Sequence, residues 1–173
     1  MSESEEGKEE RGKYGLLKLG KGDVLNKKGV IKFSPSPEER PSLIGAKCKS
    51  CGDVSFPPRH FCPKCGTELS GEYHFGTFGE IITHTTVYQG GMGIKTPYAV
   101  GMVIFPELND PELTVVSQIV DCDPKDVYIG MPVELIIDRT RSTFFGGIMK
   151  MMSMPGEHVV GFKYRPVTDG DAK

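Results

Sequence analysis

Four of the five cysteines fall into two Cys-x-x-Cys pairs, and this spacing limits the fold more than any other feature of the chain. Cys48 pairs with Cys51 and Cys62 with Cys65; each pair is followed by a glycine, and residues 52–61 separate the two. Two residues between thiolates let one tight turn direct both sulfurs to a single tetrahedral ion. The sequence therefore predicts a rubredoxin-like zinc ribbon over residues 47–70 with a closed, structural Zn2+ site made by Cys48, Cys51, Cys62 and Cys65.

Two disulfides, or a redox dithiol, are the alternatives to a metal site. Disulfides need an oxidising compartment, whereas residues 1–13 are mostly Ser, Glu, Lys and Arg and lack the apolar core of a secretory signal. We therefore expect a cytoplasmic protein with reduced thiols. A redox role suits a lone Cys-x-x-Cys better than two pairs at ribbon spacing, so zinc is the favoured interpretation.

The composition limits the chain to a small core and argues against two broad classes of function. With 173 residues, 38% of them hydrophobic, the chain can bury one core and a small satellite. The longest apolar runs, such as residues 99–105, fall far below the roughly 20 residues that cross a bilayer, so we expect no membrane association. A formal net charge of −2 supplies no positive field for indiscriminate binding of nucleic acid.

The segment before the ribbon carries weak structural signals. Residues 1–13 have almost nothing to bury and predict a disordered tail. Residues 14–46 combine sparse apolar residues with Lys and Gly, which predicts an extended or helical segment. Ser36 stands before a proline and two glutamates, the pattern of a helix start, so we expect a short helix towards Ile44 that Pro41 confines or bends.

The sequence after the second cysteine pair predicts strands. Residues 71–88 are rich in β-branched and aromatic residues and predict one long strand bent near Gly76 and Gly79. Four further strands are expected at residues 98–105, 113–120, 132–139 and 158–164, with one helical turn at residues 123–127. Five strands in this order predict a mainly β fold with a five-stranded OB-fold barrel over residues 71–167 and a short tail at residues 168–173. A small β-sandwich is the alternative.

Two connections between the expected strands are rich in glycine and apolar residues. They span residues 89–96, between the first and second strands, and residues 142–156, between the fourth and fifth. In an OB-fold these two loops border the ligand-binding face. Loops in water normally avoid Phe, Ile and Met, so we interpret these side chains as contacts for a partner or ligand. The alternative is that the second loop plugs the open end of the barrel.

Four segments, taken in order, resemble one known family. They read FPPR at residues 56–59, GTFG at residues 76–79, PYAVGMV at residues 97–103 and VDCDPKDVYIGMPV at residues 120–133. Together with the cysteine pairs they resemble the DUF35 family of zinc-ribbon and OB-fold proteins over residues 48–166. The resemblance implies a non-catalytic accessory or scaffold subunit that accompanies a thiolase-like or hydroxymethylglutaryl-CoA synthase-like enzyme.

CoA is the candidate ligand that this resemblance implies. Its phosphates suit basic groups, and its adenine suits an aromatic surface. No CoA-binding position of the family can be matched residue by residue, so candidates are chosen by residue type. They are Arg59, Lys95, Phe144 and Lys150, with Arg139, Arg141, Tyr88 and Tyr98 as further options. Each one alone is more often an ordinary surface charge or a core aromatic.

Single-stranded nucleic-acid binding is the alternative function, because zinc ribbons and OB-folds both serve it. The expected first three strands would form the binding face. They carry few basic residues and no basic–aromatic alternation, which counts against this function.

Independent catalysis is the third interpretation. Cys122 lies between Asp121 and Asp123, which raise the pKa of a neighbouring thiol and so oppose an activated thiolate. The histidines are scattered, without an acid at a motif spacing. The sequence therefore predicts a protein that is not an enzyme, with Cys122 as a buried structural thiol.

Overall fold

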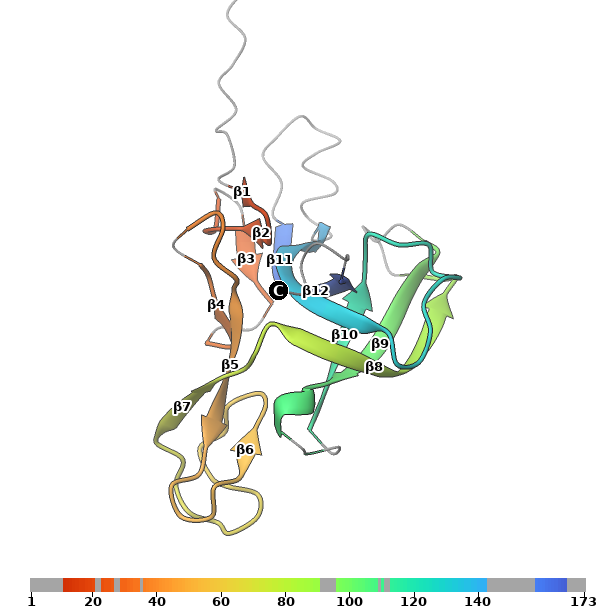
Figure 1. Cartoon of the computed structure of the whole chain (residues 1–173). Coiled ribbons are helices and arrows are strands. Elements are labelled where there is room, and N and C mark those ends of the chain that lie inside the picture. The colour runs from red at the N-terminus through yellow and green to blue at the C-terminus, as the bar shows by residue number, and fades with distance from the viewer. Residues whose placement is uncertain are drawn as a thin grey trace, which may run out of the picture.

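Strands make up nearly all of the regular structure (Figure 1). The computed structural model describes residues 11–20, 23–26, 29–34, 36–90, 96–108, 110, 113–142 and 158–167. The strands are β1 Arg11–Gly12, β2 Gly15–Leu16, β3 Asp23–Leu25, β4 Ile31–Lys32, β5 Ser42–Lys47, β6 Val54–Ser55, β7 Gly71–His74, β8 Phe78–Val87, β9 Tyr98–Ile104, β10 Thr114–Ile119, β11 Pro132–Ser142 and β12 His158–Pro166. Within the described residues the only helix is the 3-10 turn η1 at Pro106–Leu108.

Five of these strands close into a barrel. β8 pairs with β9, β9 with β10, β10 with β12, β12 with β11, and β11 again with β8. β10 and β12 run parallel, whereas the other neighbours in the barrel are antiparallel. This is the strand order of an OB-fold, so the predicted barrel is confirmed and the β-sandwich alternative is wrong.

Alternating side chains build the core of the barrel. β9 alternates half-buried and buried residues along its whole length, as a strand with one face on a core requires. Side chains with no exposed area include Ile81 of β8, Val103 of β9, Leu135 of β11 and Tyr164 of β12. Gly79 also faces this core, where a Cβ atom would overlap the Val103 side chain. The strands therefore form because each supplies one apolar row to a shared interior.

The long strand expected at residues 71–88 is in fact two strands in different sheets. β7 pairs with β5 beside the cysteine pairs, whereas β8 enters the barrel. Phe75 stands at the corner between them: it is buried, and its N–H donates to Leu43 O at 3.0 Å. Its ring packs edge-on against Phe56 and lies 4.7 Å from the ring of Phe105. The chain turns next to Gly76 because the Phe75 ring fills the space between the two sheets.

The short helix expected from Ser36 towards Ile44 is wrong. Residues 36–39 form a single turn in which the Glu39 N–H donates to Ser36 O at 3.1 Å. The next segment is strand β5, which pairs with β4, β6 and β7. Three strand partners outweigh a local helix signal, because each adds backbone hydrogen bonds that the isolated segment lacks.

The helical turn expected at residues 123–127 is a hydrogen-bonded turn. The Asp123 carboxylate accepts the Lys125 N–H at 2.9 Å, and its carbonyl accepts the Asp126 N–H at 2.9 Å. Asp123 therefore caps the turn as its sequence position suggested, but the chain does not continue as a helix.

The N-terminal segment is irregular, with short strands and without the helical structure offered as one expectation, and it lies against the barrel. β2 pairs with β11 through Gly15 and Ile137, and β3 runs parallel to β12. Tyr14 is buried, with the guanidinium groups of Arg40 and Arg165 at 5.5 and 5.8 Å from its ring centroid. These cation–π contacts help to fasten the segment to the barrel.

Residues 1–10 and 168–173, expected as parts of two tails, lie outside the described residues. None of the described helical residues forms a helix long and apolar enough to span a bilayer.

A buried ion pair lies beneath the contact of Arg165 with Tyr14. The Glu134 side chain has no exposed area, and Arg165 Nε donates to Glu134 Oε1 at 2.7 Å. Removing the guanidinium leaves a carboxylate buried without its charged partner, which typically costs several kcal/mol. The pair therefore makes β11 and β12 sensitive to a single substitution.

We expect Arg165→Met to destabilise the fold by about 3–5 kcal/mol in urea unfolding. The double variant Glu134→Gln with Arg165→Met should recover most of that loss, since it also removes the buried charge. The exposed Lys125 supplies the control, and Lys125→Met should change stability by less than about 0.5 kcal/mol. Equal stability of the Arg165 and Lys125 variants contradicts this account.

Candidate metal centre

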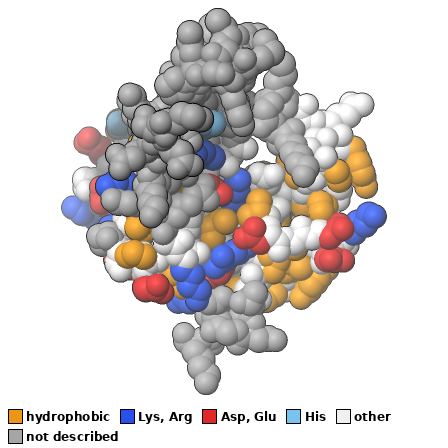
Figure 2. All heavy atoms as spheres, turned by 90° about the horizontal axis from the view of Figure 1, so that it is seen from above, with side chains coloured by type: hydrophobic (Ala, Val, Ile, Leu, Met, Phe, Trp, Pro, Cys, Tyr) orange, Lys and Arg blue, Asp and Glu red, His pale blue; other side chains and the backbone are white. Residues whose placement is uncertain are grey.

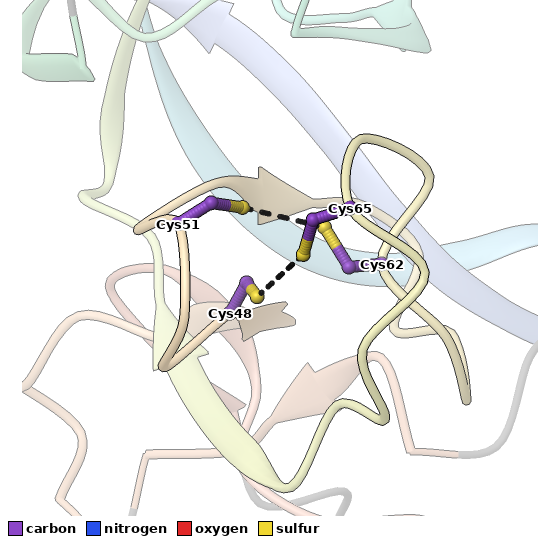
Figure 3. A group of neighbouring side chains, drawn as sticks. All are labelled: Cys48, Cys51, Cys62 and Cys65. Carbon is purple, nitrogen blue, oxygen red and sulfur yellow. Dashed lines mark hydrogen bonds between the residues drawn. The ribbon is translucent and has the colours of Figure 1, made fainter.

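Two loops with the same backbone pattern carry the four cysteines (Figure 3). In the first loop the Gly52 N–H donates to Cys48 O at 2.9 Å, and in the second the Gly66 N–H donates to Cys62 O at 2.9 Å. Both glycines have positive φ angles, 77° and 73°, which other residues adopt only with strain. The Cys-x-x-Cys-Gly pattern thus sets each loop locally, before the two loops meet.

The two loops bring four thiols into one cluster. All four Sγ atoms lie within 4.8 Å of one another, and all four cysteines are free. Cys48 Sγ is 3.5 Å from Cys65 Sγ, and Cys51 Sγ is 3.6 Å from Cys62 Sγ, so both contacts cross between the loops. Thiolates bonded at about 2.3 Å to a tetrahedral zinc ion stand about 3.8 Å apart, whereas a disulfide needs about 2.05 Å. The donor set fits a structural zinc ion with no open coordination position.

Hydrogen bonding prepares one exposed cysteine for metal binding. Cys48 and Cys62 are buried, whereas Cys51 and Cys65 reach the surface. Thr67, through its hydroxyl 3.3 Å from Cys65 Sγ and through its backbone N–H, makes the largest contribution to a lowered pKa of the Cys65 thiol. Together with the smaller effects of Cys48 and Cys51, it brings this pKa to about 6. A cysteine ligand must lose its proton, so this contact favours binding at neutral pH.

Two residues outside the cysteine set support the loops. Asp53 and Thr67 each stand two positions after the second cysteine of a pair. Asp53 O accepts the Cys48 N–H, and Thr67 O accepts the Cys62 N–H, both at 2.8 Å. Lys64 Nζ lies 3.9 Å from the Asp53 carboxylate. The sequence interpretation missed this support, although the shared offset from the cysteines was a signal that could have revealed it.

Only one of the four CoA-contact candidates, Arg59, lies within the described residues. Three lie outside the described residues: Lys95, Phe144 and Lys150. Arg59 is exposed on the ribbon and borders a hollow of about 210 Å³ between the ribbon and the connection from β9 to β10. Asp53 and Asp110 line the same hollow. An anion beside Arg59 there would also meet two carboxylates, so Arg59 stays a candidate on residue type alone.

Arg139, a further option for phosphate contact, already has an ionic partner. Its Nε donates to Asp23 Oδ1 at 2.8 Å, and its Nη2 donates to Asp23 Oδ2 at 3.3 Å. Burial of Asp23 opposes its ionisation, yet the hydrogen bonds from Arg139 and from the Gly20 N–H hold the pKa of Asp23 below its usual value. This pair fastens β3 to β11, so Arg139 has a structural role.

Cys122 has the surroundings of an unreactive thiol. It is half-buried against the barrel core. Burial raises the pKa of this thiol, and the carboxylates of Asp126, Asp121 and Asp123 raise it further. A thiol that keeps its proton at neutral pH is a poor nucleophile, which agrees with the sequence interpretation.

One group of acid, base and hydroxyl side chains was missed in the sequence. On the β5–β7 pair, His74 Nδ1 lies 3.5 Å from Ser42 Oγ, and His74 Nε2 lies 3.8 Å from the Glu72 carboxylate. The His74 and Glu72 side chains are 44% and 76% exposed, and neither residue lines the hollows beside the ribbon or beside β10. Without a pocket or a short carboxylate–imidazole hydrogen bond, this group lacks the arrangement of a catalytic triad.

The fold and the closed four-cysteine site define a protein in which a zinc ribbon precedes an OB-fold barrel. Residues 36–70 match the family described as "ChsH2, rubredoxin-like zinc ribbon domain", and residues 72–138 match "ChsH2, C-terminal OB-fold domain". The DUF35 domain-containing scaffold protein of Methanocaldococcus jannaschii is 32% identical over 148 residues, covering 83% of this chain and 95% of that relative. The chain belongs to the DUF35 family, as the sequence resemblance predicted.

Two further comparisons describe more distant similarity. The benzoylsuccinyl-CoA thiolase subunit BbsA of Thauera aromatica is 32% identical over 74 residues, covering 43% of this chain and 51% of that protein. The solved structure named "Ltp2-ChsH2(DUF35) aldolase" superposes with a TM-score of 0.55 at 20% identity, covering 73% of this chain and 86% of that one. At this identity the structural match supports the fold alone.

The four-cysteine site is tested by single serine substitutions. We expect Cys48→Ser and Cys65→Ser to lose bound zinc and loosen the ribbon while most barrel strands stay folded, because the metal closes the ribbon and the barrel has its own core. Zinc content is measured by mass spectrometry of the metal, and folding by circular dichroism. Cys122→Ser is the matched control and should keep zinc. Stoichiometric zinc in both ribbon variants disproves the site.

The Thr67 contact predicts a pH effect on zinc release. A thiol with a lowered pKa stays deprotonated to lower pH, so it holds a metal further into the acid range. Thr67→Val removes the hydroxyl, raises the pKa of Cys65, and should move the midpoint of acid-induced zinc release to higher pH. The titration is followed with a colorimetric zinc chelator. If the pH midpoint of zinc release is unchanged or lower in this variant, the assigned role of Thr67 is wrong.

Proposed function

We propose that this protein is a non-catalytic accessory subunit that scaffolds an acyl-CoA enzyme of the thiolase or hydroxymethylglutaryl-CoA synthase type. Three relatives carry the name of scaffold protein, and two more carry that of a thiolase subunit. A metal ion bound by four thiolates has no open coordination position for a substrate. The described residues also supply no nucleophile with a base in a pocket. These features favour a binding role over catalysis by the chain itself.

The observation that carries this proposal is the rigid attachment of the ribbon to the barrel. Phe56 of the ribbon packs against Phe162 of β12 at 5.9 Å between ring centroids, and Phe75 packs against Phe105 at 4.7 Å. Aromatic contacts of this kind hold two sheets in one orientation. A scaffold needs such a fixed geometry, because it positions one protein surface relative to another.

Holding two acyl-CoA enzymes side by side has a chemical advantage. A thiolase that condenses two acyl-CoA molecules works against an unfavourable equilibrium, so rapid use of its product by a neighbouring enzyme draws the reaction forward. A ribbon that docks on one enzyme and a barrel that faces the other would supply this proximity through effective concentration.

The proposal is tested with defined proteins. The chain is co-expressed with the thiolase-like enzyme of its own genome, and the complex is measured by size-exclusion chromatography with light scattering. We expect a stable complex and no thiolase turnover by the chain alone. Thiolase turnover by the purified chain overturns the proposal. So does a chain that binds neither the thiolase-like enzyme nor the synthase-like enzyme.

CoA contact through the loops is part of the same proposal. Its candidate residues are Arg59, Lys95, Phe144 and Lys150. We expect Phe144→Ala and Lys150→Ala to weaken CoA binding to the complex by about three- to tenfold in calorimetry, since each removes one stacking or phosphate contact. Lys125→Ala on the exposed β10–β11 turn is the charge control. Unchanged affinity in both loop variants removes these residues from the CoA site.

Single-stranded nucleic-acid binding has less physical support. The outward side chains of β9 are Tyr98, Val100, Met102 and Ile104, and none of them is charged. An OB-fold that follows a phosphate backbone needs basic groups on this face. Titration with single-stranded RNA at two salt concentrations separates the two functions, because binding to phosphates weakens steeply as salt rises.

A further inference from the structure

Within the described residues, one edge of β10 lacks a strand partner along most of its length. β10 pairs with β9 over all six of its residues but meets β12 at one position only, Ile119 opposite Tyr164. The Val120 N–H donates to Tyr164 O at 2.8 Å, so Val120 directs its backbone towards β12. Alternate residues of a strand direct their N–H and C=O groups to the same edge. The backbone groups of Val116 and the N–H of Gln118 therefore face that edge too, and no described strand pairs with them there, whereas the bridge between Ile119 and Tyr164 engages the Gln118 C=O.

A hollow lies beside this open edge. The first half of β12 is occupied on the same side by β3, and the Asn26 N–H donates to Val160 O at 2.8 Å. One edge of β12 thus pairs with β3 along its first half and with β10 at its second half, and β3 and β10 diverge from each other. The hollow between them has a volume of about 310 Å³ and is lined by Asn26, Tyr98, Val116, Ser117, Gln118, Thr140, Val159, Gly161 and Phe162. Its inner end is closed where Ser117 Oγ donates to Phe162 O at 3.1 Å.

The chemistry of this edge is unusual for a surface strand. β10 reads TVVSQI, without a charge or a proline, and its exposed Val116 retains 59% of its surface. None of the described side chains that line the hollow is charged. Proteins normally protect open strand edges with charged residues, proline or a bulge, because an unprotected edge pairs with other chains. An unprotected edge beside an uncharged hollow is suited to a strand from another protein.

The outward side chains of β9, next to β10, are also uncharged. Val116 stands opposite Met102 of β9, and Tyr98 of β9 also lines the hollow. The outward row of β9 is apolar and half-buried along its length. Figure 2 shows hydrophobic side chains at the surface on the side of the molecule where the barrel lies. A partner segment on the β10 edge would meet apolar surface next to the backbone hydrogen bonds.

We propose that the open edge of β10 binds an extended, uncharged segment of the partner enzyme as an added strand. Backbone hydrogen bonds to Val116 and Gln118 align the segment, and the hollow receives its apolar side chains. Among the described residues, no basic side chain lines the hollow to hold a polyanion. β3 and Asn26 border the hollow opposite β10, so an occupant lies between two strands, which favours a single extended segment over the broad face of a second barrel. The inference rests on the proposed function only for the identity of the partner.

The free protein supplies the first test, by amide hydrogen exchange. In the isolated chain the amides of Val116 and Gln118 should exchange much faster than those of Val115 and Ser117, which point to β9. In the complex with the thiolase-like enzyme, the Val116 and Gln118 amides should slow by at least tenfold. Slow exchange in the isolated chain at all concentrations means that the chain covers its own edge and overturns the inference. Slowing that grows with concentration assigns the edge to a second copy and overturns it as well.

Substitutions at the edge supply the second test. Val116→Lys places a charge on the edge, and Val116→Pro removes the backbone donor. The Val116 side chain faces water, so both variants should keep the barrel folded by circular dichroism. Each should weaken binding to the thiolase-like enzyme at least tenfold in calorimetry. Ile129→Lys, at an apolar site that is 66% exposed away from β10, is the matched control and should bind as the unsubstituted chain does.

The outcomes separate the two proposals. If the unsubstituted chain binds the enzyme and both Val116 variants bind equally well, the edge inference is wrong and the scaffold proposal stands. If the unsubstituted chain binds neither enzyme, the scaffold proposal fails and the partner assignment falls with it. Steep loss of binding with salt for single-stranded RNA at the same edge would replace the protein segment by a nucleic acid.

Discussion

The packing of Phe75 at the corner between β7 and β8 is the contact on which the rest of the structure depends. Its ring touches Tyr73 of the ribbon sheet at 5.1 Å between centroids and Phe105 of the barrel at 4.7 Å. Gly45 makes room for it, since a Cβ atom there would approach the Phe75 ring to 2.5 Å. One buried aromatic side chain thus packs against both sheets and holds the ribbon and the barrel together.

The cysteine cluster and the aromatic corner support each other. A ribbon of this size buries too little apolar surface to be stable alone, so a bound metal and a docked neighbour both have to contribute. The four cysteines bring the two loops together at one end of the ribbon, where a zinc ion would close them, and Phe56 and Phe75 fix the other end to the barrel. A scaffold built in this way presents its surfaces at a set distance and angle. That property suits a protein whose role is to position other proteins.

Local sequence patterns predicted the parts of the fold that local physics controls. The cysteine spacing revealed the ribbon because each Cys-x-x-Cys-Gly loop forms its own hydrogen bonds, as the matching Gly52 and Gly66 contacts show. The barrel strands were predictable because alternation along β9 reflects one buried face. The helix expected at Ser36 failed for the opposite reason: β5 forms through partners that lie far along the chain. The contacts of Arg139 with Asp23, and of His74 with Ser42, also join distant residues and left no sequence signal.

The sequence by itself determined the family, the grouping of the four cysteines and the order of the barrel strands, because spacing and alternation are properties of neighbouring residues. Only the tertiary structure decided where the chain turns at Phe75, which charges are already paired, and which edge of β10 stays open. An open edge is defined by a missing neighbour, and a neighbour is set by the path of the whole chain. For the same reason the candidate docking surface could be recognised only after the strands were placed.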